Sequence, residues 1–364
     1  MAKGYQSYRG RRSAGTRALI ALLVLILIAA CGFMFAQRYI AYTDDGGMYL
    51  DTPFGRIDLP APAPPVDPAP PEEEDVPPEP SVNLVKDEPA VPEEPAEEPE
   101  PPYGERRLVT LSALPADAAA LKGTLESAGA NGFLWQARSL GGQLSYASSL
   151  APAGSTAAGA ADSAALQALC AGEDVVAAAR FACFHDNVYA FIKDNMQPAG
   201  ICQRNGYIWY DNRNGHWLDP EKEQARSYVI SLAVECARMG FDELVLEEMQ
   251  YPAAGRLQKI DYSGNLMTKP QALALFLTEL REALEPYGTR ISLLLTPELL
   301  AAGSDETSGM DLPVLLPLVD AVYVAADDPA AAQAQLTALA GEDAPALVPL
   351  TAAAGEGNWC IGAG

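Results

Sequence analysis

The chain has 364 residues and a formal net charge of −24, and this charge is divided unevenly between a basic head, an acidic proline-rich neck and a larger body. Residues 1–40 carry +6, residues 60–102 carry −12 and residues 103–364 carry −15. Because the acidic body has no cluster of lysine or arginine, we expect it to bind neither nucleic acids nor other polyanions. It is long enough to form one large domain with its own core.

The first predicted element is a membrane-spanning helix. Nineteen uncharged residues fill positions 18–36, and as a helix they span about 28 Å, close to the thickness of the hydrocarbon core. Residues 1–17 carry five basic side chains, which predicts a cytoplasmic tail before an anchor over residues 18–37. The sequence therefore predicts a single-pass protein of the cell membrane with its C-terminal domain outside the cytoplasm.

Two alternatives to an uncleaved anchor remain open. Residues 28–31 resemble a bacterial lipobox, which would make Cys31 a lipid-bearing N-terminus, although the apolar run continues past this cysteine. A cleaved signal peptide would have a shorter apolar core and a cleavage site with small residues. All three alternatives place the body outside the cytoplasm.

Residues 38–105 are predicted to form an extracytoplasmic linker. Within them, residues 60–102 contain sixteen of the thirty prolines, interleaved with thirteen acidic residues. Such a segment has too little apolar surface to offset the entropy of ordering, and its charges repel one another. We expect a disordered, extended spacer of at most roughly 130 Å in polyproline II form. A proline-rich ligand for a partner domain is the alternative.

Strand-like and helix-like segments alternate in the body, residues 106–364. This alternation predicts a parallel α/β fold, and a TIM-like (β/α)8 barrel fits better than a doubly wound sheet because no glycine-rich phosphate turn follows the first strand. Only GNWCIGAG remains after Glu356, so a complete barrel and one without its last strand both remain open. The predicted strands are residues 107–111, 132–137, 175–185, 243–248, 290–296, 319–324 and 344–350. The predicted helices are residues 116–128, 162–170, 220–239, 269–286 and 329–339.

Residues 207–217, YIWYDNRNGHW, interrupt the alternation. An Asn-Gly dipeptide between two aromatic runs predicts a β-hairpin, which we expect near the mouth of the barrel. The segment does not fit a calcium loop, because its glycine is one position too early for the EF-hand pattern.

Three stretches of the body contain sequence motifs that can be compared with those of known families. Residues 206–252 contain Gly-x-x-Trp, Trp-x-Asp-Pro, a helix with a tyrosine, Gly-Phe-Asp-Glu and a strand with an acidic end. Residues 179–190 contain an arginine-bearing strand that ends in Phe-x-Asp, and residues 131–146 match a second strand more loosely. Together they resemble the bacterial family known as the putative glycosyl hydrolase domain. The resemblance implies a TIM barrel that hydrolyses glycosidic bonds.

The motifs depart from the family pattern at the ends of three strands. Residues 247–250 are Glu-Glu-Met-Gln where the family has Asp-Tyr-Val-Arg, and residues 136–139 lack its Asp-x-Lys-Asp. Residues 323–326 are Tyr-Val-Ala-Ala where the family has Met-x-Tyr-Pro-Ser. These departures leave open a barrel that has lost catalysis and serves as a glycan-binding or envelope-scaffolding module.

Glycoside hydrolysis uses two carboxyl groups, which in barrel enzymes stand at the C-terminal ends of strands. Asp186 follows the third strand and Glu247 ends the fourth, so we predict that they are the catalytic pair. Strand alternation places Glu247 with Val245 and places Glu248 on the opposite face. The predicted substrate-binding residues are Arg180, Trp209, Tyr210, Trp217 and Glu248.

Two of these assignments have alternatives. Arg180 is expected either to pair with a buried carboxylate or to contact sugar hydroxyls. The three aromatic rings of the hairpin, at Trp209, Tyr210 and Trp217, either stack against sugar faces or pack over the end of the barrel.

Other chemistries have little support in the spacing of residues. The two histidines, His185 and His216, are not accompanied by a nucleophile elbow, and no spacing typical of a metal site occurs, so neither a metal nor a cofactor is expected. Cys170, Cys202 and Cys360 could pair as disulfides, but they give no framework. The expected partner is a neutral or cationic polysaccharide, such as a cell-wall glycan.

Overall fold

The computed structural model describes residues 40–42, 48–52, 55–58, 103–172, 174–341 and 344–362. The chain divides into two units, Met1–Glu94 and Pro95–Gly364. The predicted anchor over residues 18–37 and most of the predicted linker lie outside the described residues. Within the described part, no helix has the length and apolar character needed to cross a membrane.

The first unit contains a small antiparallel sheet within the predicted linker. It is formed by β1 (Ile40–Tyr42), β2 (Met48–Thr52) and β3 (Gly55–Asp58).

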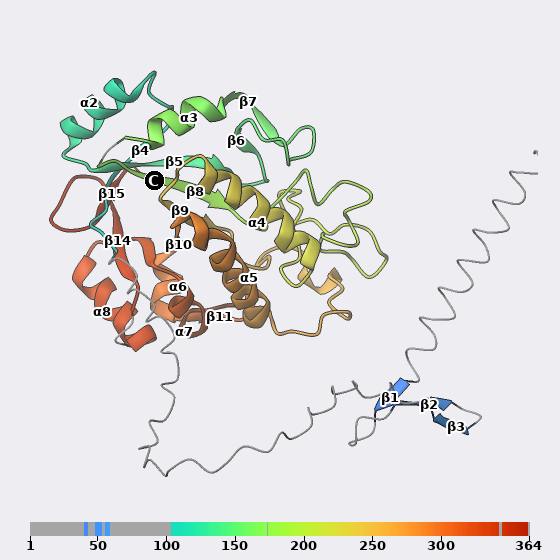
Figure 1. Ribbon diagram of the computed structural model, residues 1–364. Coiled ribbons are helices and arrows are strands. Elements are labelled where there is room, and N and C mark those ends of the chain that lie inside the picture. The colour runs from blue at the N-terminus through green and yellow to red at the C-terminus, as the bar shows by residue number, and fades with distance from the viewer. Residues whose placement is uncertain are drawn as a thin grey trace, which may run out of the picture. The chain divides into compact units, whose positions relative to one another are not determined.

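Eight parallel strands close into a barrel in the second unit (Figure 1). The strand β4 (Arg107–Leu111) pairs with β5 (Gly132–Arg138) on one side and with β15 (Trp359–Ile361) on the other, which closes the sheet. Between them follow, in chain order, β8 (Val176–Ala182), β9 (Glu243–Glu247), β10 (Arg290–Leu295), β13 (Ala321–Ala325) and β14 (Ala346–Thr351). The predicted (β/α)8 barrel is confirmed.

The last strand of the barrel is present, although it has only three residues. In β15, Cys360 pairs with Leu350 of β14 and with Leu108 of β4. A short strand is sufficient here because both of its edges are hydrogen-bonded. The structure therefore excludes the alternative of a barrel without its last strand.

Helices cover the outer wall along most of the barrel (Figure 1). Most of their bounds agree with the expected ones to within three residues. N-cap side chains explain several starts, such as Asp117 before the first helix and Thr268, with a capping box to Gln271, before the fourth. The α-helices are α2 (Ala118–Ala128), α3 (Ser163–Cys170), α4 (Glu223–Arg238), α5 (Lys269–Leu284), α6 (Pro297–Ala302), α7 (Leu312–Leu315) and α8 (Pro329–Ala340). The short 3-10 helices are η1 (Leu257–Lys259), η2 (Glu285–Tyr287) and η3 (Leu316–Leu318).

Four further strands lie outside the barrel. The strands β6 (Leu144–Tyr146) and β7 (Thr156–Ala161) extend the sheet beside β5. The strands β11 (Ser304–Asp305) and β12 (Met310–Asp311) form a small hairpin.

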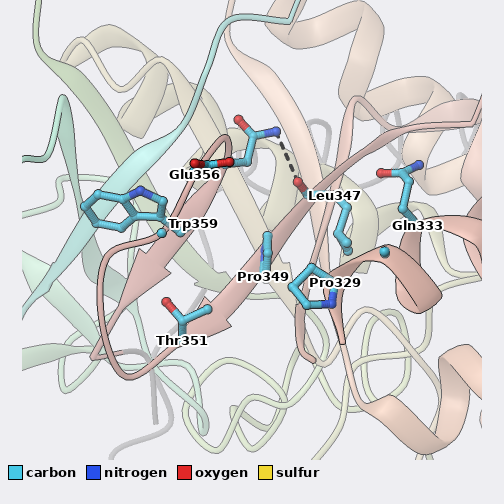
Figure 2. Close-up of a pocket in the computed structure, with 10 residues that line it drawn as sticks. Pro329, Gln333, Leu347, Pro349, Thr351, Glu356 and Trp359 are labelled. Atoms are coloured by element: carbon cyan, nitrogen blue, oxygen red, sulfur yellow. Dashed lines mark hydrogen bonds between the residues drawn. The ribbon is translucent and has the colours of Figure 1, made fainter. Parts of the chain in front are cut away.

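The wall beside β14 and β15 has no helix, because residues 352–358 join these two strands directly. A cavity of about 390 Å³ lies there, between β14, β15 and the start of α8. Figure 2 shows Trp359, Pro349 and Pro329 around it, and the hydrogen bond of 3.1 Å from Asn358 Nδ2 to the carbonyl oxygen of Leu347. This cavity lies on the outer wall and not at the mouth of the barrel.

The barrel has an apolar interior that is separate from the larger core beneath the helices. Its buried side chains come from seven different strands, so they must point toward the barrel axis. They are Leu108, Leu134, Ala178, Val245, Ala321, Tyr323, Val348 and Cys360.

The described cysteines form no disulfide, so the pairing that the sequence left open for Cys170, Cys202 and Cys360 does not occur. The five cysteines of the body, Cys170, Cys183, Cys202, Cys236 and Cys360, are all buried and free. They behave as small apolar side chains of the core.

Candidate active site

Three polar side chains form a layer above the apolar interior at the C-terminal end of the barrel. Gln136, Arg180 and Glu247 each lie two residues after an interior apolar residue of β5, β8 or β9. Because side chains alternate along a strand, all three point into the barrel mouth. The expected position of Glu247 on the face of Val245 is confirmed.

Glu247 is held on both carboxylate oxygens. Arg180 donates from Nε to Oε1 at 3.1 Å and from Nη2 to Oε2 at 2.7 Å, and Gln136 Nε2 donates to Oε1 at 2.8 Å. A guanidinium that donates two hydrogen bonds to a carboxylate stabilises its charged form and fixes its orientation. The expected pairing of Arg180 with a buried carboxylate is confirmed, and the partner is Glu247.

Glu248 is the first residue after β9, and its backbone has φ 45°, in the left-handed region. A non-glycine residue there is strained, and such residues cluster at functional sites. The alternation of the strand stops at Glu247, so Glu248 does not join the helix-facing core as its neighbours Leu244 and Leu246 do. Instead its side chain is partly buried and accepts a hydrogen bond from Gln250 Nε2 at 3.1 Å.

Burial raises the pKa of the Glu248 carboxyl above its ordinary value of 4.5. The hydrogen bond from Gln250 acts in the opposite direction, and the negative charge of Glu247 raises the pKa further. Two neighbouring carboxyl groups thus have opposite environments. The Glu247 carboxylate is paired with a guanidinium, whereas burial disfavours the anionic form of Glu248.

Asp186 has a structural position that differs from the prediction. Its side chain is fully buried against Arg138, with Nη2 2.5 Å from Oδ2. The backbone N–H groups of Val188 and Tyr189 donate to Oδ1 at 2.8 and 2.6 Å. Because neither oxygen is exposed and both are hydrogen-bonded, Asp186 cannot reach a sugar in this arrangement and instead fixes the loop after β8.

Arg138 completes this buried arrangement. It also donates to the carbonyl oxygens of Ala182 and Cys183, the latter at 2.8 Å. No motif indicated this pair, because Arg138 lies in a segment where the chain lacks the pattern of the resembling family.

The predicted hairpin lies after β8, with Tyr210 paired to His216 and Trp217 paired to His185. Trp209 is 1% exposed and donates from Nε1 to the carbonyl oxygen of Arg256 at 3.1 Å. Trp217 is also buried. These two rings therefore pack over the end of the barrel, as the alternative had it, and offer no face to a sugar. Tyr210 is 47% exposed and keeps its predicted role open.

Asp211 is a residue of the site that the sequence analysis did not single out. It accepts from Gly215 N and Arg213 N at 2.8 Å, and from Trp217 Nε1 at 3.2 Å. His185 Nε2 lies 3.8 Å from its Oδ2. The Asp-x-x-x-Gly spacing of an Asx-type turn is the signal that could have indicated it.

His185 links the hairpin to the loop after β5. Its Nδ1 accepts from Gly141 N at 3.1 Å, and burial lowers its pKa although the charges of Asp211 and Asp186 oppose this. In the neutral ring the proton therefore lies on Nε2, which faces Asp211.

A cavity of about 630 Å³ opens beside Gln136 and Arg180. Its other walls include Trp135, Asp162 and the strand β7. Its size is typical of a ligand pocket, and its lining includes the two residues that hold Glu247. Within the described residues, no group of three or more His, Cys, Asp or Glu side chains could hold a metal ion.

Comparison with solved structures finds glycoside hydrolase domains and a hypothetical protein at low identity. The glycoside hydrolase domain of PelA from Pseudomonas aeruginosa is 17% identical, with 68% of this chain and 84% of that chain covered and a TM-score of 0.39. The PgaB (BpsB) glycoside hydrolase domain from Bordetella bronchiseptica is 15% identical, with 68% and 83% covered and a TM-score of 0.45. A hypothetical protein from Ruminiclostridium thermocellum ATCC 27405 is 23% identical, with 48% and 89% covered and a TM-score of 0.41.

No curated protein matches the chain. A family model described as "Putative glycosyl hydrolase domain" matches residues 132–323, which run from the second barrel strand to the sixth and make up more than half of the chain. The chain therefore belongs to the putative glycosyl hydrolase domain family.

Proposed function

We propose that the barrel is a glycoside hydrolase in which Glu248 is the general acid and Glu247 is the ionised carboxylate. Glycoside hydrolysis requires one protonated and one ionised carboxyl group beside the scissile bond. The observation that carries the proposal is the presence of two carboxyl groups at the C-terminal end of β9 in opposite environments. Pairs of this kind separate acid and base roles in other enzymes.

The surrounding residues have distinct tasks in this proposal. Glu248 protonates the leaving oxygen as the bond from that oxygen to the anomeric carbon breaks, and Glu247 stabilises the positive charge that develops at this carbon. A water molecule from solvent then adds its oxygen to the carbon and returns a proton to Glu248. Arg180 and Gln136 donate hydrogen bonds to the Glu247 carboxylate and fix its orientation. The proposed pair thus contains Glu248 in place of Asp186, which was predicted from the sequence.

The substrate that we propose is a neutral or cationic polysaccharide of the cell envelope. Residues 103–364 carry a net charge of −15, which disfavours the approach of polyanionic glycans. We further propose that residues 18–37 anchor the protein in the cell membrane and that residues 60–102 hold the barrel at a distance outside the cytoplasm. The nineteen-residue apolar run and the flanking basic residues support this orientation.

The test is the release of reducing ends from a panel of wall and storage glycans by the full-length protein. We expect Glu248→Gln and Glu247→Gln each to reduce the rate strongly on any glycan that the wild type cleaves. Glu298→Gln is the matched control, because Glu298 is an exposed carboxylate in the first turn of α6, which also follows a barrel strand.

Two results would contradict the proposal. If Glu248→Gln cleaves at the wild-type rate, Glu248 is not the acid. If the wild type cleaves no glycan of the panel but binds one, the inactive glycan-binding module is the correct description, and the ion pair of Glu247 with Arg180 has a structural role only.

A further inference from the structure

Three aromatic side chains come together at the hairpin after β8. Tyr210 and His216 are paired in an antiparallel bridge, so their side chains lie on the same face of the hairpin. The ring of Phe191, from the loop after β8, lies 4.8 Å from the ring of His216. Phe191 is 55% exposed and Tyr210 is 47% exposed. We call these three side chains the ring surface.

The ring surface has a rigid base. His216 N donates to Asn187 Oδ1 at 2.8 Å, and the His216 carbonyl oxygen accepts from Asp186 N at 2.9 Å. Asp186 is itself fixed by the buried ion pair with Arg138. The surface therefore presents its rings in place before a ligand arrives, which lowers the entropic cost of binding.

The chemistry of these rings suits a sugar. An exposed aromatic ring is apolar on its face and, in tyrosine and histidine, polar at its edge. A pyranose ring likewise has a face of C–H groups and an edge of hydroxyl groups. Exposed aromatic side chains that cluster on a fixed backbone indicate a binding surface, whereas single exposed apolar residues are common and need no explanation.

The hairpin that carries the ring surface is connected to the end of β9. Phe184 N donates to the carbonyl oxygen of Glu248 at 3.2 Å, and the next residue, His185, is paired with Trp217 of the hairpin. Gln136 and Arg180 hold Glu247 and line the cavity of about 630 Å³. Glu247 thus adjoins the cavity, and Glu248 adjoins the hairpin that carries the rings.

We infer that a glycan chain binds on both sides of Glu247 and Glu248, in the cavity and on the ring surface, and that the enzyme cleaves within the chain. The inference rests on the proposed function and adds to it a mode of action. The substrate class is an extended polysaccharide with at least one flat, uncharged sugar face placed away from the scissile bond.

The binding test uses the full-length Glu248→Gln variant, which leaves its ligand intact, and two neutral probes, the chito- and cello-oligosaccharides of two to eight units. We expect affinity to rise with chain length. Adding Phe191→Ala and Tyr210→Ala should weaken binding of the longest probe by roughly three- to tenfold for each ring, and leave the shortest probe unaffected. Tyr210→Phe should restore most of the affinity.

A matched control is Tyr287→Ala, because Tyr287 is 40% exposed but lies in η2, just before β10 and therefore at the opposite end of the barrel. The hydrolysis test uses the otherwise wild-type protein on the parent polymers. We expect early products to be long fragments and not single sugars, with fewer long fragments after the two ring substitutions.

The two tests separate this inference from the proposed function. If the ring substitutions do not change hydrolysis, the ring surface does not bind the substrate, and the proposed hydrolase activity still stands. If binding depends on the rings but no glycan is cleaved, the ring surface binds glycans and the proposed hydrolase activity is wrong. If the wild type neither binds nor cleaves these glycans, both are overturned.

Discussion

Arg138 and Asp186 form an ion pair in which neither side chain has any exposed surface. The pair joins the end of β5 to the loop after β8, two segments that are 48 residues apart in the chain. Removing two charges from water is costly, and their attraction offsets this cost only while both partners are present. Asp186 is therefore a residue of the fold beneath the proposed site.

We predict that Asp186→Ala lowers the free energy of unfolding by about 3–5 kcal/mol, because it leaves the Arg138 charge buried without its partner. Urea unfolding of the full-length protein measures the change. The double variant Arg138→Met with Asp186→Ala should lose less stability than the single variant. A loss below about 1 kcal/mol, the range of exposed ion pairs, would show that the pair is not buried in solution.

The rate of hydrolysis should fall by about 10²- to 10⁴-fold in Glu248→Gln, because an amide cannot supply the proton that the leaving oxygen requires. In the wild type the rate should decline as the pH rises through the pKa of Glu248, which burial places above its ordinary value. A rate profile recorded across this range on one cleaved glycan tests both statements. If the residual rate of Glu248→Gln shows the same decline at high pH, another group supplies the proton to the leaving oxygen.

The same carboxyl group should make stability depend on pH. Since the pKa of Glu248 is higher in the folded chain than its ordinary value of 4.5, the folded state binds more protons between the two values. This group's contribution to the free energy of unfolding is then present below pH 4.5 and is lost as the pH rises through the folded pKa. The difference in stability between Glu248→Gln and the wild type should therefore grow in favour of the variant across this window. A difference that is constant with pH in urea unfolding would contradict the buried position of the side chain.

Gly215 provides a test of the contact between the hairpin and the loop after β8. A Cβ atom at this position would lie 2.1 Å from His185 Nε2 and 2.6 Å from Asp211 Oδ2. We expect Gly215→Ala to lower the free energy of unfolding by about 1–3 kcal/mol, the usual cost of overpacking. Urea unfolding measures this cost.

The control is Gly123→Ala. In α2, a Cβ atom at Gly123 would meet nothing within 4 Å, so this substitution should stabilise the chain by about 1 kcal/mol through helix propensity. Equal effects of the two substitutions would mean that His185 and Asp211 do not approach the hairpin as described.

Much of the fold could be predicted from the sequence because its signals are local. The alternation of strands and helices, the hairpin at residues 207–217 and the direction of Glu247 all follow from side-chain periodicity and turn residues within a few positions. The strand β15 was hard to predict for the opposite reason. Its three residues carry little local signal, and it is stabilised by hydrogen bonds to β4 and β14, which lie elsewhere in the chain.

The assignment of the site depended on contacts that no local pattern contains. Asp186 and Glu248 are both acidic residues at the ends of strands, yet one is buried against Arg138 and the other is partly exposed with a raised pKa. The rings of Trp209 and Tyr210 are adjacent in sequence but differ in exposure, 1% against 47%.

The sequence by itself determined a barrel of alternating strands and helices, and it placed Glu247 at the mouth of that barrel. Only the tertiary structure decided that Asp186 is buried, that Glu248 is partly exposed beside Glu247, and which aromatic rings face the solvent. The physical reason is that periodicity is set by neighbours along the chain, whereas burial, charge pairing and pKa are set by residues that folding brings together from distant positions, as it does for Gln136 and Glu247, 111 positions apart.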